Sequence, residues 1–302
     1  KYIYAVAPGN LTTLPEAFAT ATAEETDRAV RKAHQAFNIY GKIPGTRRAE
    51  FLNEIAQGIE DLGPILVQRI MQETAYPEAR VIVERNRTCV QLRMFAAEAI
   101  SGGWKTVTID PALPDRTPAP RPEIRKMMMP LGPVVVFGAS NFPLAYSTAG
   151  GDVASALAVG CPVIVKAHDS HLGTNALVAE VILEAARKTG MPDGVFSSLN
   201  GDGIHTGQQL VLHPLTAAVG FTGSKQGGRA LFDLGQQREN PIPVFAEMGS
   251  VNPVFIFPGK VRSDSKELAG QLVASMTMTV GQFCTNPGLL IALKDHHTET
   301  FL

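Results

Sequence analysis

The sequence predicts an α/β protein built on a Rossmann-like parallel sheet, and two patterns support this. From Leu131 onward, short β-branched runs alternate with helical segments, and these runs are VVVFGAS, CPVIVKAH, GVFSSLNG and AAVGFTG. Strands that alternate with helices form βαβ units, whose strands pair in parallel. Polar or glycine-rich residues follow these runs, where the carboxyl ends of parallel strands form ligand sites. We therefore expect the chemistry of the chain at this edge of the sheet.

Length and composition describe a globular protein of about two domains. The chain has 302 residues, of which 45% are hydrophobic and 18% charged, and a domain usually takes ~100–200 residues. A net charge of −1 means that the chain lacks the excess of positive charge with which proteins bind nucleic acid or an anionic membrane surface. The apolar run PVVVF, residues 133–137, is far shorter than the ~20 residues of a membrane span. We expect neither nucleic acid nor a membrane as partner.

The first residues and the cysteines bear on compartment and metal binding. The opening residues, KYIYAVAPGN, lack the basic and apolar regions of a signal peptide. They also lack an initiator Met, so we expect the natural start to lie upstream. Cys89, Cys161 and Cys284 are too far apart for a CxxC metal site, and their odd number fits a reduced, cytoplasmic compartment. The seven histidines show no zinc spacing, so no metal is expected.

The first 130 residues are predicted to be mainly helical, with one extended excursion. The tetrapeptide TAEE, residues 22–25, is a capping-box pattern followed by apolar residues at helical spacing. A second helical region covers about residues 46–100, with breaks near Gly63-Pro64 and Tyr76-Pro77. The chain then changes from WKTVTID to the proline-rich PALPDRTPAPRP. We interpret residues 104–125 as an extended excursion between two parts of one domain.

Two polar positions follow buried strands, and each has two interpretations. Asn141 lies just before Pro143 in VVVFGASNFPLAY, where it is either a turn asparagine or a functional amide. Lys166 ends the strand of VIVKAHDSH, with Asp169 three residues later. It is either a solvated loop lysine or a ligand contact.

The stretch AAVGFTGSKQGG carries a glycine-rich turn between a strand and a helix. Thr222, Gly223 and Ser224 end the strand, and Gly227 and Gly228 follow. Glycines allow close backbone approach to a phosphate, and the next helix would point its N–H groups at it. A plain strand–turn–helix connection is the alternative, since the pattern is not GxGxxG.

Glu247 and Cys284 are the two most reactive candidates. Glu247 ends the apolar run of PVFAEMGSVNPVF, so we expect it to be buried and to act as a general base, or else to belong to a buried hydrogen-bonded network. Cys284 lies in the glycine-framed polar turn GQFCTNPG, which suits an exposed nucleophile with backbone N–H donors nearby. The alternative is a small buried hydrophobe. Cys89 and Cys161 are predicted to be packing residues.

The order of these residues resembles the NAD(P)-dependent aldehyde dehydrogenase superfamily. The resemblance runs Asn, Lys, Phe-Thr-Gly-Ser, Glu and Gly-Gln-x-Cys, and it covers nearly all of the chain. Its most specific stretches are FGASNFPLAYSTAGGD, FTGSKQGGRALFD, PVFAEMGSVNPVF and GQFCTNPG. They look like the branch that contains bacterial α-ketoglutarate semialdehyde (2,5-dioxovalerate) dehydrogenases and related NADP-linked enzymes.

The resemblance implies a catalytic set. Cys284 stands at the position of the cysteine that attacks the aldehyde, and Asn141 at that of the amide that holds the oxyanion together with the cysteine's own N–H. Glu247 matches the glutamate that activates water to hydrolyse the thioester. Oxyanion donors are worth roughly 2.7–4 kcal/mol each, and a thioester needs a positioned base to be cleared by water.

The resemblance also implies NADP or NAD as cofactor. Lys166 matches a contact to the adenosine ribose, and Ser224 a contact to the pyrophosphate. Asp169 aligns with an acidic residue that binds the ribose hydroxyls in NAD-preferring relatives. Further positions expected at the cofactor are Phe137, Thr222, Gly223 and Gly228, and a 2′-phosphate would be accommodated by His168, His171 and Lys225. Because the branch often uses NADP, we expect NADP, with NAD as the alternative.

For a semialdehyde that carries a carboxylate, the resemblance places a helix with ERNRTCVQLRMF along the substrate tunnel. We hypothesise that Arg87 clamps the distal carboxylate, with Phe142 as a further substrate contact and Arg93 as a structural residue. A small-molecule aldehyde is therefore the expected partner. Relatives are dimers or tetramers, so self-association is expected too.

The expected domains are an NAD(P)-binding domain of residues 1–105 and 125–246, an extended bridging or oligomerisation excursion of residues 106–124, and the beginning of a catalytic domain at residues 247–302. The aldehyde dehydrogenase fold is expected to be C-terminally incomplete, because no E-x-F-G-P motif follows the cysteine. The alternatives are a truncated nucleotide-binding fragment without turnover, a CoA-acylating relative, and, as the weakest, a cysteine hydrolase. The presence of Glu247 argues against the CoA-acylating relative.

Overall fold

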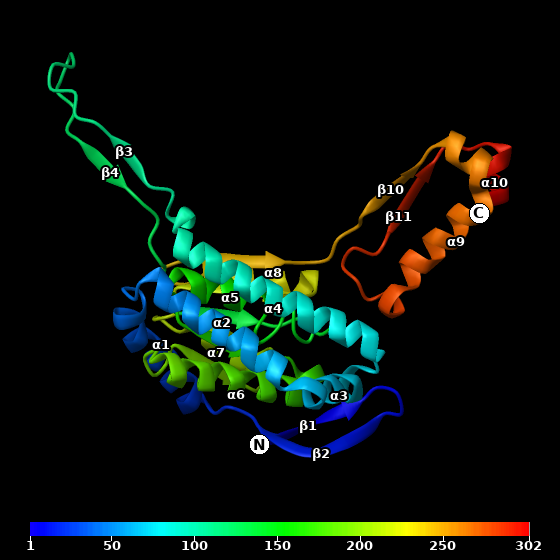
Figure 1. The fold of residues 1–302 in the computed structure, drawn as a ribbon, viewed down its shortest axis with the longest axis horizontal. Helices are drawn as coiled ribbons and strands as arrows, with labels where there is room; N and C mark the ends of the chain where they lie inside the picture. Colours follow the sequence, from blue (N-terminus) through cyan, green and yellow to red (C-terminus); the bar gives the residue numbers. More distant parts are fainter. Residues whose placement is uncertain (302) are drawn as a thin grey trace. The chain divides into compact units, whose positions relative to one another are not determined.

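The computed structural model describes residues 1–301 and divides into two compact units, Lys1–Ala246 and the part from Glu247 onward. Figure 1 shows the elements of both. The first unit holds a sheet with helices on both faces, and the second holds two strands and two helices.

The main sheet has five strands in the order β7-β6-β5-β8-β9. The strands are β5 (Val134–Phe137), β6 (Val163–Lys166), β7 (Phe196–Leu199), β8 (Ala218–Thr222) and β9 (Val244–Glu247). The pairs β5–β6, β6–β7 and β5–β8 are parallel. The chain moves outward from β5 to β7 and then returns to β8 on the other side of β5, which makes a topological switch point between β5 and β8. The predicted α/β class and parallel sheet are confirmed.

Alternate residues of the strands face two separate hydrophobic cores, because successive side chains of a strand point to opposite faces. Val134, Val136, Val163 and Val165 belong to a core with helices α2 to α6. Val135, Phe137, Ile164 and Val219 belong to a second core with α1, α7 and α8. Burial on both faces explains why these strands are apolar throughout rather than alternating.

The helices of the first unit are α1 (Ala23–Tyr40), α2 (Gly45–Asp61), α3 (Gly63–Thr74), α4 (Glu78–Ser101), α5 (Gly151–Val159), α6 (Leu172–Thr189), α7 (His205–Leu212) and α8 (Lys225–Gln236). The predicted capping box is confirmed, since Thr22 accepts from the Glu25 N–H at 3.2 Å and Glu25 accepts from the Thr22 N–H at 2.9 Å. The predicted breaks are confirmed as well. Helix α2 ends at Asp61, and Pro77 immediately precedes α4. Short 3-10 turns cover Gly103–Lys105 (η1) and Asp169–His171 (η2).

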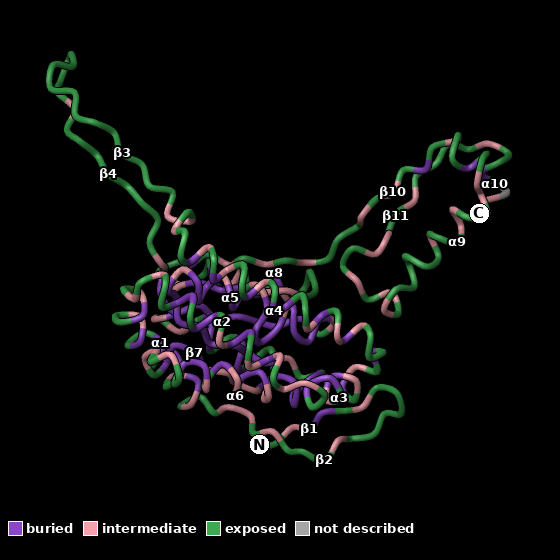
Figure 2. The backbone as a smooth tube through the Cα atoms, viewed as in Figure 1, coloured by how far each residue is buried: buried purple, intermediate pink, exposed green. Residues whose placement is uncertain are grey.

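Two antiparallel hairpins complete the first unit. Strands β1 (Tyr2–Ala7) and β2 (Thr12–Ala19) form one that the sequence did not indicate. Strands β3 (Thr108–Asp110) and β4 (Ile124–Lys126) form the other, within the segment predicted to be extended. Its residues are almost all exposed, as Figure 2 shows. The chain around it exposes the apolar side chains Val107, Ile109, Leu113, Ile124, Met127, Met128 and Met129.

The second unit contains a two-stranded parallel sheet and two helices. Strands β10 (Pro253–Ile256) and β11 (Leu289–Ala292) pair in parallel. Helix α9 (Pro258–Thr277) connects them through the 3-10 turn η3 (Met278–Gly281), and α10 (His296–Phe301) follows. A parallel pair needs such a crossover. The crossover returns the chain to β11 through the turn that holds Cys284.

Candidate active site

A cavity of about 640 Å³ lies at the carboxyl ends of the central strands of the first unit. This volume is within the range of small-molecule and cofactor sites, ~300–1,000 Å³. The cavity is at the switch point between β5 and β8, where doubly wound sheets bind their ligands. Its lining comes from the ends of β5, β6 and β8, from the start of α7 with the turn before it, and from α8 with its N-cap. It consists of Phe137, Gly138, Lys166, His168, Asp169, Gly203, Ile204, Gln208, Phe221, Ser224, Gln226, Gly227, Ala230, Leu231 and Leu234.

Lys166 and Asp169 form an ion pair at the carboxyl end of β6. Lys166 Nζ donates to Asp169 Oδ1 at 2.9 Å, and the lysine is buried while the aspartate is exposed. Lys166 is therefore a wall residue of the cavity and not a solvated loop lysine. The pairing offsets the negative charge of Asp169, which would otherwise repel an anionic ligand in the cavity.

His168 is held in its neutral form beside this pair. Burial, together with the neighbouring His171 and Lys166, lowers the pKa of His168 from 6.5 to about 4. Its Nδ1 accepts a hydrogen bond from the Ser170 N–H at 3.1 Å. A second proton on the ring would remove that acceptor, so the geometry agrees with the neutral state.

The depressed pKa of His168 predicts a stability that falls with acid. The unfolded chain binds a proton at His168 below about pH 6.5, whereas the folded chain resists protonation down to about pH 4. Stability is thus fully present above pH 6.5 and declines as the pH falls from 6.5 toward 4, with a loss of up to about 2 kcal/mol between pH 7 and pH 5. Urea unfolding at the two pH values measures this, and His168→Gln should reduce the difference. An equal pH dependence in both proteins would contradict the prediction.

Ser224 begins helix α8 as its N-cap. Its Oγ accepts from the Gly227 N–H at 3.1 Å, which leaves the N–H groups of the first turn directed out of the helix end. A helix N-terminus of this kind attracts phosphate groups. Thr222 and Gly223 precede Ser224, and Gly228, which follows Gly227 in α8, is buried. These three do not line the cavity, whereas Ser224 does.

Asn141 lies in the loop between β5 and α5, also in the first unit. The loop is mostly buried, and Phe142 is only 7% exposed. Arg87 projects from α4 onto this loop, and its Nη2 donates to the Tyr146 hydroxyl at 2.6 Å. Its guanidinium carbon lies 5.9 Å from the centre of the Phe142 ring and 5.1 Å from that of Tyr146. Arg93 instead forms a bidentate pair with Glu60, 2.7 Å for each contact.

Cys284 lies in the second unit, in an exposed turn. The glycines that frame it are required by the backbone: Gly281 has φ +72°, and a Cβ on Gly288 would lie 2.6 Å from the Val251 carbonyl oxygen. Ser250 Oγ and Asn252 Nδ2 both donate to the Cys284 carbonyl. The turn is thus fixed by its backbone, while the thiol is left accessible. The alternative of a small buried hydrophobe is excluded.

The prediction that Glu247 is buried is wrong. The side chain is exposed at the end of β9. Apolar sequence around it misled the prediction because Phe245, on the same face of the strand, is itself 65% exposed. The segment after Glu247 nevertheless approaches the cysteine turn, since Ser250 and Asn252 hold the Cys284 carbonyl.

The two remaining cysteines are packing residues. Cys89 and Cys161 are buried, as predicted, and burial raises the pKa of Cys89 to about 11.

In the part of the chain that the structure describes, no three His, Cys, Asp or Glu side chains gather in a way that could hold a metal ion. None of the described helices has the length and apolar character needed to cross a membrane.

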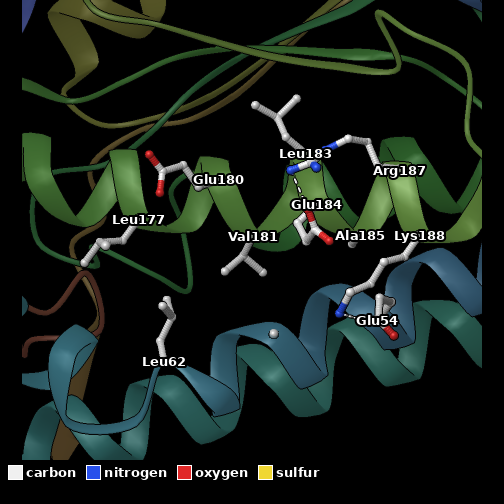
Figure 3. A pocket seen from close by; sticks show the side chains of 11 residues that line it. Glu54, Leu62, Leu177, Glu180, Val181, Leu183, Glu184, Ala185, Arg187 and Lys188 are labelled. Atoms are coloured by element: carbon white, nitrogen blue, oxygen red, sulfur yellow. Dashed lines mark hydrogen bonds and ion pairs between the residues drawn. The ribbon is translucent and has the colours of Figure 1, made fainter.

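A different cavity, of about 540 Å³, lies between α2 and α6. Figure 3 shows Leu62, Leu177 and Val181 at this groove and the Lys188–Glu54 ion pair at one end of it. It contains no strand end, glycine turn or candidate residue. We do not assign it a function.

Sequence reasoning missed several residues around the site. Gly203, Ile204 and Gln208 line the cavity from the turn before α7 and from α7 itself. The glycine pair in NGDGI, residues 200–204, was the available signal for that turn. Tyr76, Arg80 and Glu84 contact the Asn141 loop from α4 and its start. Arg80 and Glu84 have the i, i+4 spacing of a helical ion pair, but nothing local shows that they meet the loop.

A doubly wound sheet with a cavity at its switch point is the arrangement of nucleotide-binding α/β proteins. More specifically, the chain belongs to the aldehyde dehydrogenase family, because the model of that family matches residues 3–302.

Three known proteins illustrate the relation. The chain is 52% identical over 284 residues to alpha-ketoglutaric semialdehyde dehydrogenase 2 of Azospirillum brasilense, and 47% identical over 285 residues to alpha-ketoglutaric semialdehyde dehydrogenase of Acinetobacter baylyi. In each case the match covers 94% of this chain and 54% of the relative. A solved structure of NADP-dependent glyceraldehyde-3-phosphate dehydrogenase from Bacillus halodurans, complexed with NADP, superposes with a TM-score of 0.81 at 26% identity, covering all of this chain and 60% of that one. The chain thus spans about half the length of the curated relatives it matches.

Proposed function

We propose that the protein oxidises an aldehyde that carries a carboxylate, of the α-ketoglutarate semialdehyde class, to the carboxylic acid with NADP or NAD as hydride acceptor. The observation that carries the proposal is the 52% and 47% identity, over 94% of the chain, to two proteins named as alpha-ketoglutaric semialdehyde dehydrogenases. The exposed Cys284 turn and the cavity at the switch point support it.

The residues of the chain then have the following roles. The Cys284 sulfur attacks the aldehyde carbon, a C–S bond forms, and the carbonyl oxygen becomes an oxyanion held by the Cys284 N–H and the Asn141 amide. A bound nicotinamide would supply the acceptor for the hydride of this carbon, and loss of that hydride leaves a thioester on Cys284. Glu247 takes a proton from water while the water oxygen adds to the thioester carbon, and the C–S bond then breaks. The leaving sulfur takes the proton back from Glu247, which releases the carboxylic acid and restores the Cys284 thiol.

The cavity at the switch point is the proposed cofactor site. It combines an apolar wall from Phe137, Leu231 and Leu234 with the cation of Lys166 and the N-terminus of α8 at Ser224. The adenine ring of a dinucleotide needs the first feature, Lys166 is the proposed contact to the adenosine ribose, and a pyrophosphate suits the helix N-terminus at Ser224. Because Lys166 pairs with Asp169 at 2.9 Å, a 2′-phosphate next to Asp169 meets less negative charge. We therefore favour NADP over NAD.

Arg87 is the proposed clamp for the distal carboxylate of the substrate. Its guanidinium is exposed, is oriented by Tyr146 at 2.6 Å and stacks over two aromatic rings. Such a cation is pre-organised for a planar carboxylate. Phe142, whose ring lies under the Arg87 guanidinium, is proposed as a further substrate contact.

Arg87→Met should raise the KM for an anionic semialdehyde by roughly 10- to 100-fold, the value of one charge-assisted hydrogen bond. The KM for a neutral aldehyde of similar length should change little. Arg93→Met is the matched control, since Arg93 pairs with Glu60 and should not discriminate between the two aldehydes. An equal change in KM for both aldehydes in Arg87→Met would refute the clamp.

We also propose that residues 1–105 and 125–246 form the nucleotide-binding domain, that the excursion of residues 106–124, which holds β3 and the start of β4, serves self-association, and that residues 247–302 begin the catalytic domain. Exposed apolar side chains on the hairpin, such as Ile109 and Leu113, support the second point. Three free cysteines support a reduced, cytoplasmic setting.

The test of the whole proposal is NADPH and NADH formation by the native protein on α-ketoglutarate semialdehyde, in parallel with its native mass. Turnover that depends on the semialdehyde supports the function, and a mass above that of one chain supports self-association. Nucleotide binding without turnover on this or other aldehydes would instead favour a nucleotide-binding role.

A further inference from the structure

The loop that carries Asn141 has backbone N–H groups that the loop itself does not satisfy. Leu144 and Ala145 are fully buried, and both of their N–H groups donate to the same oxygen, Glu84 Oε1, at 2.9 Å each. A buried N–H without a partner costs about 1–3 kcal/mol. The shape of the loop therefore depends on a carboxylate from α4, 60 residues earlier in the chain.

Glu84 is in turn held by its own helix. Its side chain is 2% exposed, and Arg80 Nη1 contacts its second carboxylate oxygen, Oε2, at 2.6 Å. A carboxylate at this depth is tolerated because it is paired and fully hydrogen-bonded. The Arg80 guanidinium carbon also lies 4.8 Å from the centre of the Phe142 ring, next to Asn141 in sequence. The Arg80–Glu84 ion pair therefore contacts the loop on both sides of Pro143: Arg80 contacts Phe142 before it, and Glu84 accepts from the two N–H groups after it.

Asn141 itself is contacted through its backbone. The Tyr76 hydroxyl donates to the Asn141 carbonyl oxygen at 3.1 Å, and burial raises the pKa of Tyr76, so the hydroxyl keeps its proton. Two residues before Asn141, the Ala139 carbonyl oxygen lies 3.0 Å from His171 Nε2. The backbone that bears the Asn141 side chain is therefore held at Asn141 by the segment between α3 and α4, and at Ala139 by η2.

We infer that Glu84, together with Tyr76, is a positioning residue that holds the Asn141 amide where the oxyanion develops. The inference rests on the proposed function. Oxyanion donors act through pre-organisation, so a displacement of about 1 Å costs up to ~100-fold in rate. Glu84 touches neither substrate nor cofactor and acts only through the loop.

Glu84→Gln should slow the first turnover of hydride release by roughly 10- to 100-fold, because one amide group cannot serve two N–H donors and the Arg80 cation as a carboxylate does. Cofactor affinity should stay within about twofold, since the cavity at the switch point is not involved. Glu73→Gln is the matched control. Glu73 is also buried, is paired with Arg69 in the same i, i+4 way, and accepts from two consecutive N–H groups, those of Gly173 and Thr174, but on α6. It should lose stability without this loss of rate.

A double-mutant cycle separates positioning from a general structural role. Asn141→Ala should lower the first-turnover rate by about 10²–10³-fold, and adding Glu84→Gln to it should lower the rate little further, because the group that Glu84 positions is already gone. Tyr76→Phe, which removes a single hydroxyl, is the milder variant if Glu84→Gln does not fold, and it should show the same non-additivity. Hydrogen exchange of residues 142–150 should be faster in Glu84→Gln than in the wild type.

Losses that multiply in the double mutant, a wild-type rate in both Glu84→Gln and Tyr76→Phe, or unchanged exchange of residues 142–150 would each overturn the inference. These outcomes differ from a failure of the proposed function, in which the wild-type protein itself releases no NADPH or NADH from any aldehyde.

Discussion

Cys284→Ala should abolish aldehyde oxidation while leaving nucleotide binding intact. The thiol is the proposed nucleophile, and no C–S bond can form without it, so turnover should fall by roughly a thousand-fold or more. Folding should be little affected, because Cys284 is exposed and its turn is held by hydrogen bonds to the backbone carbonyl, which alanine retains. The cavity that we assign to the cofactor lies in the first unit and does not include this residue.

The measurement combines initial rates with titration of NADPH fluorescence. Cys161→Ala is the control, since Cys161 is only 3% exposed and should affect stability more than rate. Residual activity of a tenth or more in Cys284→Ala would show that the nucleophile lies elsewhere.

Glu247→Gln should stop the reaction after one turnover. Attack by Cys284 and hydride release do not need the carboxylate, so about one equivalent of NADPH should form per active site. Steady-state turnover should then fall by roughly 10²–10⁴-fold, the usual contribution of a general base. The side chain is exposed at the end of β9, so water has access to the carboxylate.

A rapid-mixing experiment resolves the burst from the steady state, and mass spectrometry of the stalled protein should show an acyl group on Cys284. Glu299→Gln, on α10 of the same unit, is a charge-matched control that should retain steady-state turnover. Normal steady-state turnover in Glu247→Gln would remove this residue from the mechanism. Recovery of turnover by added CoA, in the wild type as well, would favour the acyl-transferring alternative.

Much of the fold could be predicted from local sequence. The runs VVVF and VIVK are β-branched and apolar throughout, which fits strands buried on both faces, and they became β5 and β6. Thr22 and Glu25 fixed the start of α1, and the prolines at residues 64 and 77 marked breaks between helices. The glycines around Cys284 indicated an exposed turn correctly, because positive φ and close backbone approach are properties of that short segment alone.

Other features depended on partners far away in the chain. Glu247 was predicted to be buried because its neighbours are apolar, yet burial is decided by what covers the strand, and β9 is an edge strand whose Phe245 is also exposed. The β1–β2 hairpin had no usable local pattern. The glycines of NGDGI indicate a turn, but nothing local shows that Gly203 and Gln208 line the cavity.

The sequence by itself determined the α/β class, the alternation of strands and helices, the capping of α1 and the glycine-framed turn of Cys284. Only the tertiary structure decided the strand order, the cavity at the switch point and the contact between Glu84 and the Asn141 loop. The physical reason is the distance along the chain over which each kind of interaction acts. Periodicity, caps and turn glycines act over a few residues, whereas a buried N–H of Leu144 finds its acceptor only when packing brings a carboxylate from another helix to it.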